Sequence, residues 1–499
     1  MTTQHRAELR RVLPWALLLL YAACCVLYCA DPWWRPDWDG AVYLLTGKSL
    51  AEGHGYAYLD RPFFLRPPGL PYLFSFFLEG GRFDFAAINL ALLSFAGLAV
   101  AMIYLALRPL HGAWIALSVA LLTGTSSLFT HFFNHALAEY PYFTLFFLGL
   151  ILYQASLRDC SRWWLLALSG GVFMAAAFYL RTTAALVLPA VLLLSVLRGM
   201  GRRRFSGLLL CAVVGLLALP WFTYSRDAAS RAIVPVEQEV QLDYATALLH
   251  EDPGDPGSPR VSPETLLRRV RQNGSLLMDE LVMTTFHVEE AGIWFRLLLV
   301  VAVLCGLSIC LRRGHLVYEW LTAVSCLVVV AYFAYGSRLL VPLVPMVYLY
   351  VAVCLSAVGG AAARALRRPW LKTGIWGVAF AALLLSNAPN FRAHMLVPED
   401  PTPTYRQLAK WIEQNTPPDA VLLCNQAPTL SLLSRRTAYT YRFPRSADLL
   451  ATYEPDFVIL DGPQPSGLLP LVTSRTVRRH LVTLDSGARI PVYELARDR

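Results

Sequence analysis

The sequence predicts a polytopic α-helical membrane protein with a small α/β domain at its C-terminal end. Apolar runs of roughly 17 to 22 residues recur along the first 390 positions, and about 20 helical residues cross a hydrocarbon core of about 30 Å. Only 15% of the 499 residues are charged, well below the roughly 25% of an average soluble protein. From about Phe391 onward, short strand patterns and an amphipathic helix replace the apolar runs.

About eleven membrane spans are expected from the lengths of the apolar runs. They lie at residues 13–30, 86–107, 113–130, 141–157, 163–180, 183–197, 206–224, 292–311, 316–335, 339–359 and 373–390. The count depends on a break at YLRTTAA, because a single helix over 163–197 would reverse the side of every later segment. The basic cluster at 198–204 favours two helices. The first run lacks a small-x-small cleavage site, which predicts an uncleaved anchor.

The basic residues predict the orientation of the chain. The segments HRAELRR, LRGMGRRRF, LRRGH and ARALRRPWLK all fall on the cytoplasmic side if the N-terminus is cytoplasmic, as the positive-inside rule requires. This distribution accounts for the net charge of +9 without a nucleic-acid partner. We therefore expect a multi-pass protein of the cytoplasmic (inner) membrane, with the C-terminal domain on the opposite, outer side.

Two long loops of the membrane domain, residues 1–390, are expected on the outer side. The first, about 31–85, contains RPPGLPYL, whose two prolines favour an extended or turned backbone. The apolar stretches AVYLLTGKSL and LPYLFSFFLEGG are too short to span a membrane and suit helices that lie in its interface. The second loop, about 225–291, is acidic on balance and carries the turn-rich insert DPGDPGSP.

Residues 391–499 predict a water-facing α/β domain. The segment YRQLAKWIEQN places Tyr405, Leu408, Trp411 and Ile412 on one face of a helix, and the following Pro-Pro ends it. Strands are expected at AVLLC, TAYTYRF and PDFVILDG, and a hairpin at HLVTLDSGARIPVYEL.

The unusual charges of the membrane domain gather on the predicted outer side. They are Asp37 and Asp39 after the first span, Arg66 in LRPPG, Glu139 in AEYPYF, Arg181 after the fifth span and Arg338 in SRLLVPLVP. Charges near a membrane are functional candidates because an unpaired charge there is costly. Carboxylates and arginines on one face suit a general base beside an anion clamp.

Each of these residues also has a purely structural interpretation. Asp39 could be the N-cap of the helix GAVYLLTGKSL, and Glu139 could cap a helix or form a structural ion pair. Arg181 and Arg338 could extend toward lipid headgroups, and Arg66 could pair with an acid of its loop.

The order of several motifs resembles a known family. An acid after the first span is followed by Y-x-x-x-x-x-S-L-x-x-G-x-G-Y, by a basic residue before PPG-x-P, by AEYPYF and by SRLLVPLVPMVYLY. The sequence is similar to the GT-C class of polyprenyl-phosphate-sugar-dependent glycosyltransferases, and most similar to the protein O-mannosyltransferase and aminoarabinose-transferase branch (glycosyltransferase families 39 and 83). The resemblance extends over essentially the whole membrane domain.

This resemblance implies roles for individual residues. Asp39, four residues before Tyr43, matches the catalytic base, and Arg66 matches the residue that contacts the lipid phosphate. Glu139 is similar to a second outer acid and is the second catalytic candidate, and Arg338 matches the arginine of R-x-L-x-P-x-x-P. Relatives often carry Asp-Glu where this chain has Asp39-Gly40, so Asp37 either replaces the second acid or is incidental.

The chemistry implied is transfer of a sugar from a polyprenyl-phosphate donor to a lipid, glycan or protein acceptor on the outer face. Asp39 would take the acceptor's proton, with Asp37 and Tyr43 as possible support. Arg66, Arg338 and Arg181 would stabilise the phosphate that leaves. Direct attack on the anomeric carbon would invert its configuration.

A divalent metal ion is a further possibility, although no cofactor is required by the motifs. His131, His135 and Glu139 would share one face if their segment were helical, and His287 lies beside Glu289 and Glu290 in the second outer loop. A His-x-x-x-His pair can bind zinc, but no third ligand is fixed by the spacing. Asn273-Gly-Ser is a glycosylation sequon in the second outer loop, but a motif this short also occurs by coincidence.

Two other functions are also compatible with a membrane protein whose charges lie at the ends of its spans. A polysaccharide polymerase or ligase would also take lipid-linked donors, and a lipid-linked sugar transporter or flippase would move them uncleaved. Transporters place their charges near the bilayer midplane and often show repeats, whereas these charges lie at the ends of spans. Neither the sugar nor the acceptor is specified by the sequence.

Overall fold

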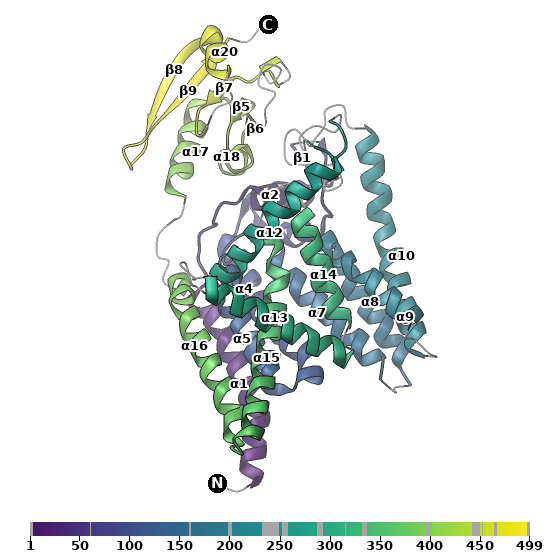
Figure 1. The fold of residues 1–499 in the computed structure, drawn as a ribbon. Coiled ribbons are helices and arrows are strands. Elements are labelled where there is room, and N and C mark those ends of the chain that lie inside the picture. Colours follow the sequence, from purple (N-terminus) through teal and green to yellow (C-terminus); the bar gives the residue numbers. More distant parts are fainter. Residues whose placement is uncertain are drawn as a thin grey trace.

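The computed structural model describes residues 3–59, 61–158, 161–197, 202–231, 249–251, 258–286, 293–314, 316–331, 337–395, 400, 402–441, 450–451, 453–463 and 467–496. Within these residues the chain forms a helical bundle and a small mixed α/β domain (Figure 1). The N-terminus lies at one end of the bundle, and the α/β domain lies at the opposite end. The predicted fold class is confirmed.

Every predicted span contains a helix. The helices are α1 (Thr3–Tyr28), α4 (Phe85–His111), α5 (Ala113–Thr125), α7 (Glu139–Ser156), α8 (Trp163–Leu180), α9 (Leu188–Leu197), α10 (Arg202–Arg231), α13 (Ile293–Arg313), α14 (Leu316–Ala331), α15 (Val344–Ala365) and α16 (Trp370–Met395). Seven helices of the described residues are long and apolar enough to cross a membrane, and three shorter apolar helices accompany them.

The break predicted at YLRTTAA is present. Helix α8 ends at Leu180, Arg181 adopts an extended conformation, and the 3-10 helix η1 (Thr182–Val187) leads into α9. Residues 163–197 are therefore not one helix. Two further 3-10 turns, η3 (Ser337–Leu339) and η4 (Val341–Leu343), precede α15, and Pro342 lies in η4.

The first long loop is folded tightly on the bundle. It contains the two expected short helices, α2 (Trp38–Ala51) and α3 (Gly69–Ser75), together with the strand pairs β1 (Ala57–Tyr58) with β2 (Arg61–Pro62) and β3 (Leu78–Glu79) with β4 (Arg82–Phe83). Helix α3 begins directly after Pro68, which occupies the N-cap position, and Pro71 lies in its first turn, where a proline is tolerated. Another short helix, α6 (Ser127–Thr130), follows α5.

The second long loop departs from the expectation of a turn-rich segment. Helix α10 continues to Arg231, and an amphipathic helix, α12 (Pro263–Phe286), packs beside α14 (Figure 1). The amide of Asn273 is buried on α12 and donates to the carbonyls of Val329 and Val330 at 3.5 and 3.3 Å. A buried Asn273 is not available for glycosylation in this conformation.

The C-terminal domain contains a five-stranded sheet in the order β6-β5-β7-β9-β8. Strands β5 (Val421–Cys424), β6 (Thr437–Thr440) and β7 (Phe457–Ile459) are parallel, and β8 (Thr476–Thr483) and β9 (Arg489–Leu495) form the expected hairpin. Helices α17 (Pro403–Asn415), α18 (Ala427–Ser434) and α20 (Leu468–Arg475) complete the domain. Leu422 and Leu423 belong to separate apolar clusters, so both faces of the sheet are covered.

The C-terminal domain contacts the first loop. Helix α18 packs against α2. The guanidinium of Arg406 lies over the Trp33 ring at 4.9 Å, and that of Arg61 lies over the Tyr439 ring at 5.7 Å. These contacts place the domain on the same end of the bundle as α2 and α3 (Figure 1).

Candidate active site

The two acids of RPDWDG have different roles at the start of α2. Asp37 is the N-cap, and its Oδ1 accepts hydrogen bonds from the backbone N–H groups of Asp39 at 2.9 Å and Gly40 at 3.2 Å. The interpretation of Asp39 as the N-cap is therefore wrong. Because Asp37 occupies the cap, the Asp39 side chain in the first turn is available for other partners.

Asp39 lies between two arginines that come from distant parts of the chain. Arg66 Nη2 donates to Asp39 Oδ1 at 2.8 Å, and Arg338 Nη1 donates to Asp39 Oδ2. Arg66 follows the β1–β2 pair, and Arg338 lies in η3 before α15. The Asp39 side chain is 16% exposed and that of Arg66 is 9% exposed, so both ion pairs are largely shielded from water.

Glu139 extends this arrangement at the first residue of α7. Its Oε1 accepts hydrogen bonds from Arg338 Nε at 2.7 Å and from Arg181 Nη1 at 2.9 Å. The Glu139 side chain is only 1% exposed. Arg66, Asp39, Arg338, Glu139 and Arg181 thus form one chain of alternating charges, which we call the ion-pair chain.

The arginines control the protonation of Asp39. Burial alone would raise the pKa of Asp39, but the guanidinium groups of Arg66 and Arg338 outweigh that effect and lower the pKa to about 2. Burial raises the pKa of Asp37, and the neighbouring Asp39 raises it further. Asp39 is therefore ionised throughout the physiological range.

Aromatic residues of the first loop hold Arg66 in position. Its guanidinium lies over the Tyr43 ring at 5.3 Å, and the Tyr56 hydroxyl donates to the Arg66 carbonyl at 2.8 Å. Tyr43 was expected from the sequence as a supporting residue. Tyr56 is the last residue of the motif S-L-x-x-G-x-G-Y, and the sequence alone did not predict its contact with Arg66.

Gly40 explains the missing second acid. A Cβ atom at position 40 would lie 3.3 Å from the Ala136 carbonyl oxygen and 3.6 Å from Trp34 Nε1. A glutamate there would need the space that the 131–138 turn occupies. Asp37 does not replace that acid, because its carboxylate caps α2.

The proposed metal ligands that the structure describes do not form a cluster. Helix α6 ends at Thr130 and α7 begins at Glu139, so His131, His135 and Glu139 do not share one helical face, as Asn134 takes a positive φ of 62° between them. His287 lies outside the described residues. No group of three His, Cys, Asp or Glu residues suited to a metal occurs in the part of the chain that the structure describes, and arginines already neutralise Asp39 and Glu139. These residues do not fit a metal site.

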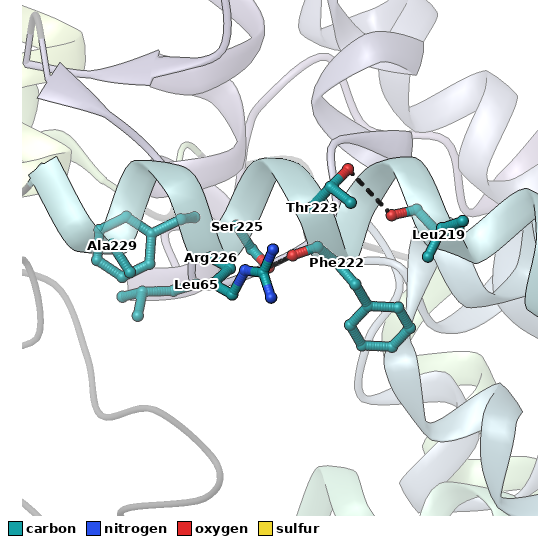
Figure 2. Close-up of a pocket in the computed structure, with 8 residues that line it drawn as sticks. Leu65, Leu219, Phe222, Thr223, Ser225, Arg226 and Ala229 are labelled. Carbon is teal, nitrogen blue, oxygen red and sulfur yellow. Dashed lines mark hydrogen bonds between the residues drawn. The ribbon is translucent and has the colours of Figure 1, made fainter.

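A pocket of about 630 Å³ lies between α10 and the segment that precedes Arg66. It is lined by Phe64 and Leu65, which directly precede Arg66, and by a stretch of α10 that includes Phe222 and Arg226 (Figure 2). This stretch belongs to a candidate membrane span, Arg204–Ser230. Its lining thus combines apolar side chains with the polar groups of Thr223, Ser225 and Arg226.

Part of the chain matches a known protein family. Residues 65–224 match the model of the dolichyl-phosphate-mannose-protein mannosyltransferase family. This stretch holds Arg66, Glu139 and Arg181. No curated protein sequence matches the chain significantly.

Solved structures are similar over nearly the whole chain. ArnT from Cupriavidus metallidurans bound to undecaprenyl phosphate is 15% identical, with a TM-score of 0.59 and 98% of each chain covered. The oligosaccharyltransferase AglB from Archaeoglobus fulgidus, in complex with an inhibitory peptide and a dolichol phosphate, is 11% identical, with a TM-score of 0.60 over 98% of this chain and 75% of that one. AglB has also been solved with zinc and sulfate, at 13% identity and a TM-score of 0.59 over 95% of this chain and 72% of that one.

Proposed function

We propose that this chain is an inverting glycosyltransferase that moves a sugar from a polyprenyl phosphate to an acceptor at the outer face of the cytoplasmic membrane. The observation that carries the proposal is the buried Asp39 carboxylate between Arg66 and Arg338. The Asp39 carboxylate can accept a proton, and the two guanidinium groups in direct contact with it can bind a phosphate. The similarity to ArnT bound to undecaprenyl phosphate supports the donor class.

Asp39 acts as the general base in this proposal. Its pKa of about 2 keeps it ionised, but a base this weak takes a proton poorly. A donor phosphate that draws Arg66 and Arg338 toward itself would weaken both ion pairs and raise the pKa of Asp39. Donor binding would thereby activate the base at the moment when the acceptor hydroxyl or amine needs it.

Arg66 and Arg338 stabilise the leaving phosphate. Guanidinium–phosphate contacts are strong and can be bidentate, and they gain strength in a site shielded from water. Arg181 and Glu139 hold Arg338 from its other side. They act as positioning residues, since Arg338 Nε is already engaged by Glu139 while Nη1 faces Asp39.

The pocket lined by Phe64 and Leu65, the two residues before Arg66, suits the first isoprene units of the donor lipid. Phe64, Leu65, Leu219 and Phe222 supply apolar walls (Figure 2). A lipid in this pocket would place its phosphate near Arg66. The sugar would then lie toward Asp39 and the acceptor would arrive from the aqueous side.

The topology of the proposal is an N-terminus in the cytoplasm and a C-terminal domain outside. It is supported by the basic segments of the sequence and by the positions of the N-terminus and the α/β domain at opposite ends of the bundle. A reporter fused after Arg499 should be active only outside the cytoplasm. Activity inside the cytoplasm would contradict this orientation.

Donor turnover tests the function itself. The purified chain in nanodiscs would receive undecaprenyl-phosphate hexoses and pentoses and an envelope extract as acceptor, and mass spectrometry would follow free undecaprenyl phosphate and new glycosylated products. Transfer predicts that both increase together. Movement of intact donor across liposomes, with no cleavage, would instead indicate a flippase.

A further inference from the structure

Arg35 lies beside the ion-pair chain but is not part of it. It follows the buried Trp34 and is fixed by backbone contacts to the 131–138 turn, where Arg35 N–H donates to the Asn134 carbonyl at 3.2 Å. Arg35 also forms an isolated β-bridge with His135. The Asn134 side chain donates to the Cys29 carbonyl at 2.8 Å, so the end of α1 and this turn form one rigid unit.

One edge of the Arg35 guanidinium has no hydrogen-bond partner among the described residues. Its Nη1 lies 3.4 Å from His394 Nδ1 at the end of α16. Its Nε and Nη2 are buried, and neither has a hydrogen-bond partner among the described residues. These two nitrogens form one side of the guanidinium plane, which is the fork that binds carboxylates and phosphates in a bidentate manner.

Arg35 differs in this respect from the arginines of the ion-pair chain. Arg66, Arg181 and Arg338 each donate to a carboxylate. Among the described residues, no carboxylate lies within ion-pair distance of Arg35. Arg35 is half-buried, but its Nε and Nη2 are shielded from water without an anionic partner. Such shielding of a charged group is costly, so a bound anion would offset that cost.

Three histidines lie around Arg35. The rings of His131 and His135 stack with centroids 5.7 Å apart, and His394 contacts Arg35 directly. Burial, with the neighbouring His131 and Arg35, lowers the pKa of His135 to about 3. Its Nδ1 is buried and has no partner in the described part of the chain. His131 is exposed, which gives the cluster an opening to the surface.

One acid lies nearby and must be considered. Asp31 uses Oδ1 to accept the Trp33 N–H at 2.7 Å, and its Oδ2 has no partner among the described residues. Asp31 partly offsets the lowering of the Arg35 pKa that burial causes. It does not occupy the Nε–Nη2 edge, and the positive Arg35 makes the same cluster unsuitable for a metal cation.

We infer that Arg35, His131, His135 and His394 line a second oxyanion-binding pocket, which takes a phosphate or carboxylate group of a substrate. The assignment of that group to a substrate rests on the proposed function. The pocket lies next to the site because Trp34 and Ala136 both pack against Gly40, the residue after Asp39. Two substrates of the proposed reaction can supply the group, namely an anionic acceptor and the polyprenyl phosphate.

Phosphate binding to the full-length chain in nanodiscs tests the pocket without any turnover. Equilibrium dialysis with radiolabelled inorganic phosphate should show saturable binding to the wild type. Arg35→Gln should weaken it at least about tenfold, because two charge-assisted hydrogen bonds are lost. Arg108→Gln, near the C-terminal end of α4, is the matched control and should bind phosphate like the wild type.

A second variant and a lipid arm complete the design. His135→Gln should also weaken phosphate binding, and it keeps the test decisive if Arg35→Gln fails to fold. Saturating undecaprenyl phosphate identifies the source: phosphate that still binds assigns the pocket to the acceptor, and phosphate that is displaced assigns it to the donor. Absence of saturable binding, or unchanged binding in both variants, would overturn the inference, whatever the outcome of the donor-turnover experiment.

Discussion

Arg338 connects both carboxylates of the ion-pair chain, so its removal is the most informative perturbation of the donor site. Its Nε donates to Glu139 at 2.7 Å and its Nη1 donates to Asp39. Truncation of one member of a buried charge pair costs roughly 2–5 kcal/mol. At about 1.4 kcal/mol per tenfold change, Arg338→Ala should reduce donor kcat/KM by roughly 30-fold to several thousand-fold.

The conservative variant separates charge from geometry. Arg338→Lys keeps the charge but lacks the planar fork that contacts two acids at once, so it should recover only part of the activity. The assay is a donor titration at fixed acceptor, with undecaprenyl phosphate release as the signal and melting temperature as the folding control. Arg108 is an exposed arginine, and Arg108→Gln is the control variant, which should keep the wild-type donor kcat/KM. Unchanged donor kcat/KM in a folded Arg338→Ala would refute the assignment of the phosphate to this arginine.

Three further predictions concern the start of α2. Asp37→Ala should destabilise the chain by about 1 kcal/mol while Asp37→Asn should be nearly neutral, because asparagine also caps helices; thermal unfolding of both variants checks this. Asp39 has its pKa lowered to about 2 from an ordinary 3.8, so its ion pairs contribute up to about 2.5 kcal/mol. This stability is fully present above about pH 3.8 and is lost as the pH falls through about 2, and the acid-denaturation curve of Asp39→Asn should lack that component. Gly40→Ala places a Cβ atom 3.3 Å from the Ala136 carbonyl oxygen, so this variant should have a lower melting temperature than the wild type. An unchanged melting temperature with full activity would contradict the close packing around Gly40.

Much of the fold was predictable because membrane helices are recognised in a sequence by their length and hydropathy. The first loop was also predictable, since two short apolar stretches around a Pro-Pro pair fit no other arrangement. Helix α12 was missed because an amphipathic helix within a polar, turn-rich loop resembles a surface segment. Its packing against α14 depends on contacts that only the folded chain provides.

The site residues were predictable as a set but not as pairs. Asp39 and Arg338 are 299 positions apart, and no local pattern links them. Which acid caps α2 depends on backbone conformation: Asp37 has φ −140° and ψ 142°, the extended geometry of an N-cap. The histidines misled the sequence interpretation because Asn134, with a positive φ, ends any helical continuation before Glu139. Arg35 precedes Pro36 in the same RPDWDG segment, but no sequence pattern distinguishes it from an ordinary loop arginine.

The most direct test of the account is single-turnover sugar transfer by Asp39→Asn. Asparagine keeps the shape of the side chain but cannot accept the proton, so the rate should fall by about 10²–10⁴. Undecaprenyl phosphate binding should remain within a few-fold of wild type, and Asp37→Asn should transfer at nearly the wild-type rate. Near-wild-type transfer by Asp39→Asn, or loss of transfer in Asp37→Asn alone, would contradict the assignment of Asp39 as the base.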